Sequence, residues 1–146
     1  MNTPAAAERT AIAIDIDLPF QRVLAAWLAA RAYRVLFLSL DDAFGVGGQI
    51  DLVVCELAEP KGDGAQALRR LARRFQGAPL IAISPRFVAD ARRGALARQL
   101  GVQAALAKPC LRYDFDAALD AAVSMPAQTH PPPDNHRAMH RPRHGR

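Results

Sequence analysis

Residues 51–64, DLVVCELAEPKGDG, contain the stretch that decides the fold. The apolar run at residues 52–55 ends at a single acid, Glu56, and a loop with one proline and two glycines follows. A short apolar run bounded by turn residues is typical of a strand buried on both faces of a parallel sheet. Because α/β proteins place their binding and catalytic side chains at the carboxyl ends of such strands, the stretch predicts a site around Glu56.

The same alternation of strand and helix continues along the chain. Short apolar runs predict strands at residues 11–14, 35–40, 51–57, 78–84 and 102–108. Apolar residues at helical spacing predict helices over residues 18–32, 65–75, 87–100 and 111–122. The glycine-rich stretch after the second strand allows only a short helix, and Gly101 suits the end of the helix before it. Strands that alternate with helices predict a doubly wound α/β fold with a five-stranded parallel sheet.

Composition divides the chain into three segments. Residues 1–9 form an N-terminal extension, residues 10–124 carry all the predicted elements, and residues 125–146 form a basic tail rich in Pro, His and Arg, which we expect to be disordered. The net charge is +5, and from residue 127 onward four arginines oppose one aspartate, which places three of these charges in the tail. The domain itself is nearly balanced, so we expect nucleic acid to bind only weakly, through the tail.

Several other functional classes are disfavoured by the sequence. Cys55 and Cys110 have no spacing that indicates a zinc site or a disulfide framework, and Cys55 is expected in the core. All the histidines lie in the tail, where a specific metal site is not expected. The longest apolar run, VLAAWLAA, is too short for a bilayer, so we expect a cytoplasmic protein without a membrane partner. With neither a nucleophile elbow nor a glycine-rich phosphate loop, we expect no enzyme activity.

Four places within residues 10–124 resemble the receiver domain of two-component response regulators. Asp15 ends the first strand, and Glu56 stands where the family has its phosphoacceptor aspartate. Ser84 occupies the hydroxyl position after the fourth strand, and Lys108 with Pro109 closes the stretch GVQAALAKP. The resemblance implies a CheY-like, flavodoxin-like sheet of order 2-1-3-4-5, in which strands one and three meet at the switch point.

The resemblance also implies roles for individual residues. Asp15 and Asp17 would form an acidic pocket beside Glu56, while Ser84 and Lys108 would sense a bound phosphate. Pro109 is a candidate for a cis peptide or a turn. The family holds Mg²⁺ at this pocket, for which Asp15 and Glu56 are the matching ligands here.

The chain departs from the family pattern at three positions. Glu56 carries its carboxylate about 1.5 Å further out than an aspartate would, and in-line transfer is sensitive to such a shift. Ile16 replaces the direct metal ligand, although Asp17 would point the same way as Asp15 on an extended strand. Ala105 stands at the aromatic switch position. We therefore expect no cofactor, or at most weak Mg²⁺ binding.

The sequence leaves some residue roles open. Glu56 is an ion-pair partner of Lys108, a partial mimic of the phosphorylated state, or a slow phosphoacceptor. Asp15 is a remnant metal ligand or the N-cap of the first helix, and Ser84 is a phosphate-sensing hydroxyl or a helix cap. Asp41 and Asp42 are predicted to cap the short helix. The arginine pairs at 69/70 and 73/74 are predicted to form a solvated face.

Taken with the resemblance, these observations favour a stand-alone degenerate receiver in two-component or phosphorelay signalling. We expect a protein–protein interaction module that works without ordinary phosphorylation. Its partner would be a histidine kinase, a phosphotransferase or an output protein, and the resemblance places a partner or homodimer face on residues 86–124. The alternatives are an active single-domain phosphoreceiver and a nucleic-acid-associated module that uses the arginine faces and the tail.

Overall fold

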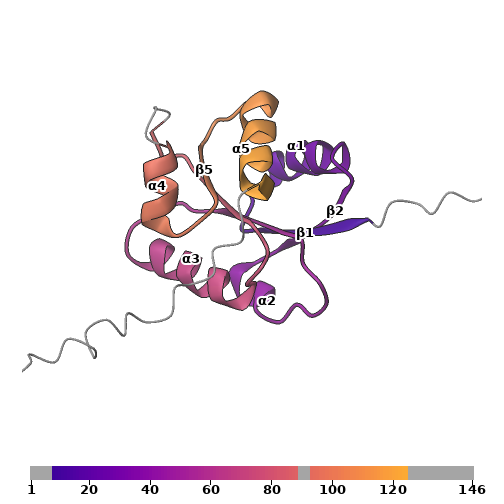
Figure 1. Ribbon diagram of the computed structural model, residues 1–146, viewed down its shortest axis with the longest axis horizontal. Helices are drawn as coiled ribbons and strands as arrows, with labels where there is room; N and C mark the ends of the chain where they lie inside the picture. The colour runs from indigo at the N-terminus through magenta and orange to yellow at the C-terminus, as the bar shows by residue number, and fades with distance from the viewer. Residues whose placement is uncertain (1–7, 89–92, 125–146) are drawn as a thin grey trace, which may run out of the picture.

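The computed structural model describes residues 8–88 and 93–124 (Figure 1). Five parallel strands form one sheet in the order β2-β1-β3-β4-β5. The strands are β1 (Arg9–Ile14), β2 (Tyr33–Leu38), β3 (Leu52–Glu56), β4 (Leu80–Ser84) and β5 (Ala104–Ala107). The helices are α1 (Leu18–Ala29), α2 (Leu40–Ala43), α3 (Asp63–Arg74), α4 (Arg93–Leu100) and α5 (Arg112–Ser124). The structure thus confirms the doubly wound, flavodoxin-like fold and its strand order.

Helices cover both faces of the sheet, as Figure 1 shows for α1 and α5 on one side and α3 on the other. Alternate residues of β1 point to opposite faces, so that Ala11 and Ala13 pack with α1 and α5, while Ile12 and Ile14 pack with α2, α3 and α4. Phe115 of α5 is fully buried in the first of these two cores. Strands covered on both faces explain why their sequences are continuously apolar.

Some element boundaries differ from the predictions. The second strand ends at Leu38 because Ser39 caps α2, which begins at Leu40. The helix predicted to start at residue 87 starts later, because Phe87 lies in a turn whose N–H bonds to the carbonyl of Ser84. Residues 89–92, the N-terminal seven residues and the tail predicted to be disordered lie outside the described residues. Gly101 follows α4 with a φ of 73°, as its predicted role requires.

The arginines of α3 are all exposed, but they do not form a single solvated face. The guanidinium of Arg70 lies 4.5 Å from the ring centroid of Phe44. Arg74 donates to the backbone carbonyls of Phe44 and Val46, the first at 3.3 Å. These two side chains therefore hold the connection after α2, whereas Arg69 and Arg73 point elsewhere.

No helix in residues 8–88 and 93–124 is long and apolar enough to cross a membrane.

Candidate functional site

The predicted site lies at the carboxyl edge of the sheet, where four strands end together. Glu56 is the last residue of β3 and pairs in register with Ile83 of β4. Because β3 lies between β1 and β4, the residues that follow β1 lie on one side of Glu56 and Ser84 lies on the other. Lys108 comes directly after β5 and reaches across β4 toward the same point. The topology thus gathers residues that are far apart in the sequence.

The centre of this site is an ammonium group shared by two carboxylates. The Nζ atom of Lys108 lies 2.8 Å from Oε2 of Glu56, and it also contacts the carboxylate of Asp17. The side chains of Lys108 and Glu56 are only 21% and 13% exposed. Such partial dehydration strengthens the attraction between the charges but also makes it costly to leave either one unpaired. Lys108 therefore links β5, β3 and the start of α1.

Asp17 has two roles that the sequence reasoning missed. It is the N-cap of α1, where its side chain accepts a hydrogen bond from the N–H of Phe20 at 2.9 Å. Its own N–H donates to Oε1 of Glu56 at 3.3 Å. The signal for this cap was the proline at residue 19, because proline is favoured in the first turn of a helix. Lys108 also lies 5.0 Å from the ring centroid of Phe20, so the capped turn presents an aromatic face to the ammonium.

The backbone of Asp15 does not have the extended conformation that the sequence analysis assumed, and Asp15 is not the N-cap of α1. It has a φ of 56°, in the left-handed region that aspartate tolerates better than most residues, so it does not continue the extended strand toward Asp17. Its Oδ1 accepts a hydrogen bond from the N–H of Leu40 at 3.2 Å. Asp15 therefore braces the start of α2 and does not cap the first helix. The predicted capping by Asp41 and Asp42 was also wrong, because Ser39 supplies the N-cap and the two aspartates lie in the first turn.

The described residues at this edge present no assembled magnesium site. Ile16, at the position of the family's direct metal ligand, is 6% exposed and packs in the core beside α1. Asp17 and Glu56 already share the ammonium of Lys108. Across residues 8–88 and 93–124, no cluster of three or more His, Cys, Asp or Glu side chains could hold a metal ion. Mg²⁺ is usually held by one or two carboxylates and several waters, and here the carboxylate oxygens of Asp17 and Glu56 are already engaged by Lys108 and by backbone N–H groups.

Ser84 lies at the end of β4 with its side chain fully buried. Its hydroxyl oxygen accepts a hydrogen bond from the N–H of Arg86 at 3.0 Å, and its carbonyl accepts one from the N–H of Lys108. The hydroxyl is thus engaged in the turn after β4. The peptide bond between Lys108 and Pro109 is cis. Ala105 is buried in β5, so no aromatic ring stands at that position.

Burial dominates the electrostatics of the site. It raises the pKa of Glu56, and the negative charge of Asp15 adds to this shift. Burial also lowers the pKa of Lys108. The pKa of Cys55 is raised to about 12, mainly by burial and also by Asp15 and Glu56, so its thiol stays protonated and behaves as the predicted core residue.

Comparison with known proteins identifies the fold. No family model and no curated protein sequence matches the chain. A response regulator from Thermotoga maritima superposes with a TM-score of 0.66 and 17% identity, covering 80% of this chain and 98% of that one. The receiver domain of a sensor histidine kinase from Pseudomonas aeruginosa PAO1, with a magnesium ion coordinated in its active-site cleft, gives 0.61 and 22%, covering 82% and 100%.

A third solved structure is a complex from R. sphaeroides between the P1 domain of a CheA protein and a CheY protein. The matched chain is 17% identical with a TM-score of 0.63, and the match covers 82% of this chain and all of that one. The chain therefore has the fold of CheY-like receiver domains, over about four-fifths of its length. At these identities the likeness defines the fold, and function has to be argued from the site.

Proposed function

We propose that this protein is a degenerate receiver that acts in two-component or phosphorelay signalling as a protein–protein interaction module without being phosphorylated. The observation that carries the proposal is the pairing of Lys108 with Glu56 at 2.8 Å. In an active receiver the equivalent lysine binds the incoming phosphoryl group. Here it is neutralised by carboxylates of its own chain before any phosphoryl group arrives.

Two further features argue against phosphoryl transfer to Glu56. The acidic metal ligand is replaced by Ile16, and phosphoryl transfer depends on metal ions to neutralise the charge that develops on the phosphoryl oxygens. Glu56 is fixed at both carboxylate oxygens, one by Lys108 and one by the N–H of Asp17. A carboxylate held in this way is poorly placed for in-line attack. The single negative charge of Glu56, placed beside Lys108, instead imitates part of the charge of a phosphoryl group.

The surface between residues 86 and 124 is the proposed partner face. Large apolar side chains are exposed there: Val88 at 71%, Leu111 at 73% and Tyr113 at 81%. Exposed aromatic and aliphatic residues of this size are typical anchors in protein interfaces. The complex of a CheY protein with a kinase P1 domain supports a histidine kinase, phosphotransferase or output protein as the partner. A homodimer through the same face is the other form that this proposal takes.

Phosphodonor labelling tests the proposal directly. The full chain and its Glu56→Gln variant would be incubated with acetyl phosphate and Mg²⁺, and their intact masses measured beside an active receiver. We expect neither form to gain a phosphoryl group. We also expect binding to a purified histidine phosphotransfer domain, or dimerisation, to be unchanged by the phosphodonor. A phosphoryl adduct on the wild type that is absent from Glu56→Gln would instead identify a working phosphoreceiver.

A further inference from the structure

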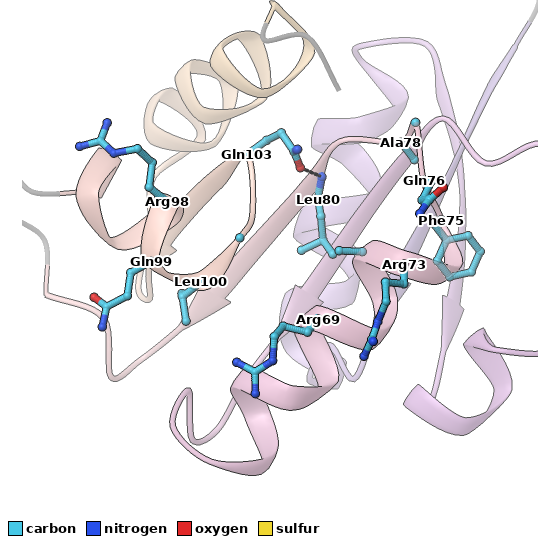
Figure 2. Close-up of a pocket in the computed structure, with 13 residues that line it drawn as sticks. Arg69, Arg73, Phe75, Gln76, Ala78, Leu80, Arg98, Gln99, Leu100 and Gln103 are labelled. Carbon is cyan, nitrogen blue, oxygen red and sulfur yellow. Dashed lines mark hydrogen bonds between the residues drawn. The ribbon is translucent and has the colours of Figure 1, made fainter. Parts of the chain in front are cut away.

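A cleft lies at the edge of the sheet opposite to Glu56, between α3 and α4 (Figure 2). Its volume is about 320 Å³, near the lower end of the range for binding pockets. The apolar part of its lining comes from the end of α3, the start of β4 and the end of α4, with Phe75, Leu80 and Leu100 as the largest side chains. The cleft is therefore separate from the site described above and from the role proposed for it.

Three arginines line this cleft, and no acid stands beside them among the described lining residues. Arg69 and Arg73 come from α3, Arg98 comes from α4, and none of the described lining residues is Asp or Glu. Within residues 8–88 and 93–124, these three arginines form no ion pair. Arg70 and Arg74 on the same helix, by contrast, are engaged by Phe44 and its neighbouring carbonyl groups. Two of the four arginines of α3 thus hold the connection after α2, and the other two, Arg69 and Arg73, line the cleft.

The arrangement of Arg69 and Arg73 favours an anionic partner. Because they are four residues apart, they lie on one face of α3 and repel each other. Figure 2 shows these two side chains along α3, with Arg98 directed away from the cleft. A carboxylate placed between Arg69 and Arg73 would relieve the repulsion and could accept paired guanidinium hydrogen bonds.

The interior of the cleft suits an apolar group better than an anion. The carboxyl ends of α3 and α4 both adjoin it, and their carbonyl groups carry partial negative charge. A negative charge is therefore favoured at the arginine rim and disfavoured deeper in the cleft. The side-chain oxygen of Gln103 accepts a hydrogen bond from the N–H of Leu80 at 2.7 Å, so the polar groups at the start of β4 are engaged beside the apolar lining. These constraints define an occupant with an apolar centre and an acidic border.

We propose that this cleft binds an acidic peptide segment of a partner protein, with one large apolar side chain inserted over Leu80 and Leu100. Acidic residues beside that anchor pair with Arg69 and Arg73. Nucleic acid fits the cleft less well, since single strands need exposed aromatic rings on which bases stack. Phe75 is the only ring among the described lining residues, and it is 7% exposed.

Selection from a phage-displayed library of random linear peptides tests this inference on the full chain. The cleft variant carries Arg69→Gln and Arg73→Gln. A matched control carries Arg22→Gln and Arg34→Gln, which remove the same charge from exposed positions without ion pairs among the described residues. We expect the wild type and the control to enrich peptides in which Asp or Glu flank one large apolar residue, and the cleft variant to lose this enrichment.

The most enriched peptide would then be synthesised and titrated into ¹⁵N-labelled protein. Saturable shifts are expected at residues 69–80 and 98–103, with affinity about tenfold lower in the cleft variant and nearly unchanged in the control. Enrichment of no peptide, or of peptides without acidic residues, would overturn the proposal. Equal losses of affinity in both variants would overturn it too, as would a DNA duplex that shifts the same amides at lower concentration than the peptide does.

Discussion

Replacing Lys108 by methionine removes the ammonium group while retaining an unbranched apolar stem of similar length. Asp17 and Glu56 would then lose the ion-pair partner that they share, and no other ion pair of theirs is found among the described residues. Glu56 is the more affected of the two, because its side chain is only 13% exposed. We therefore expect Lys108→Met to destabilise the fold.

The size of the effect follows from the burial of the pair. Removing one partner of a fully buried ion pair costs about 3–5 kcal/mol, whereas an exposed pair contributes about 0–1 kcal/mol. Side chains that are 21% and 13% exposed lie between these limits, so we expect a loss of about 2 kcal/mol. For a domain of this size, that loss corresponds to a melting temperature lower by roughly 8 °C.

Urea unfolding of four proteins would measure this loss and its origin. These are the wild type, Lys108→Met, Glu56→Gln and the double variant. We expect a coupling energy of about 1 kcal/mol or more between the two positions, since each single change breaks the same pair. A stability change below about 0.5 kcal/mol for Lys108→Met, with no coupling, would refute the argument that this pair organises the site.

The loss should also depend on pH. The folded-state pKa of Glu56 is raised above its unfolded value of about 4.3, so the native state binds more protons between the two pKa values. The stability that Glu56 contributes is therefore fully present below about pH 4.3 and is lost as the pH rises through the folded pKa. Lys108→Met removes a positive charge that favours the ionised carboxylate, so its deficit relative to the wild type should widen as the pH rises above the unfolded pKa of Glu56. A deficit independent of pH would contradict this account.

Three other substitutions test separate parts of the structure. Ile16→Asp should lower the free energy of unfolding in urea by about 2 kcal/mol or more, because it places an unpaired carboxylate in the core; unchanged stability with a new affinity for Mg²⁺ would disprove this. Gly64→Ala should lower the melting temperature by several degrees, because its Cβ would overlap the carbonyl oxygen of Glu59, whereas Gly47→Ala meets nothing and should not; equal effects would count against this packing. Arg74→Gln should speed amide hydrogen exchange in the connection after α2 and leave the sheet unchanged.

The order of the elements was predictable from the sequence, because strands buried on both faces read as continuous apolar runs. The apolar run at residues 52–55 predicted β3, and the acid that follows it, Glu56, predicted the edge of the sheet at which the site lies. The start of α4 was not predictable in this way. Phe87 is buried like a helical core residue, yet its backbone belongs to the turn after β4.

The location of the site was predictable, and the ion pair between Glu56 and Lys108 was one of the predicted alternatives, but the other contacts of the site were not. Strand order alone brings Glu56 and Lys108 to one edge. The roles of Asp15 and Asp17 depend on backbone angles after β1, and the left-handed conformation of Asp15 has no simple sequence signal for a non-glycine residue. The division of the α3 arginines into two sets was also hidden, because it depends on where the connection after α2 passes over Arg70 and Arg74.

The most direct test of the central claim is an NMR titration of the ¹⁵N-labelled protein with Mg²⁺ and then with beryllofluoride, a mimic of the phosphoryl group. The amides of Asp15, Glu56, Ser84 and Lys108 report on the site. If the ammonium is already held by the protein's own carboxylates, these amides should not shift at millimolar Mg²⁺, with or without the mimic. Saturable shifts at these residues that spread across the proposed partner face would contradict the claim and identify a receiver that still accepts phosphate.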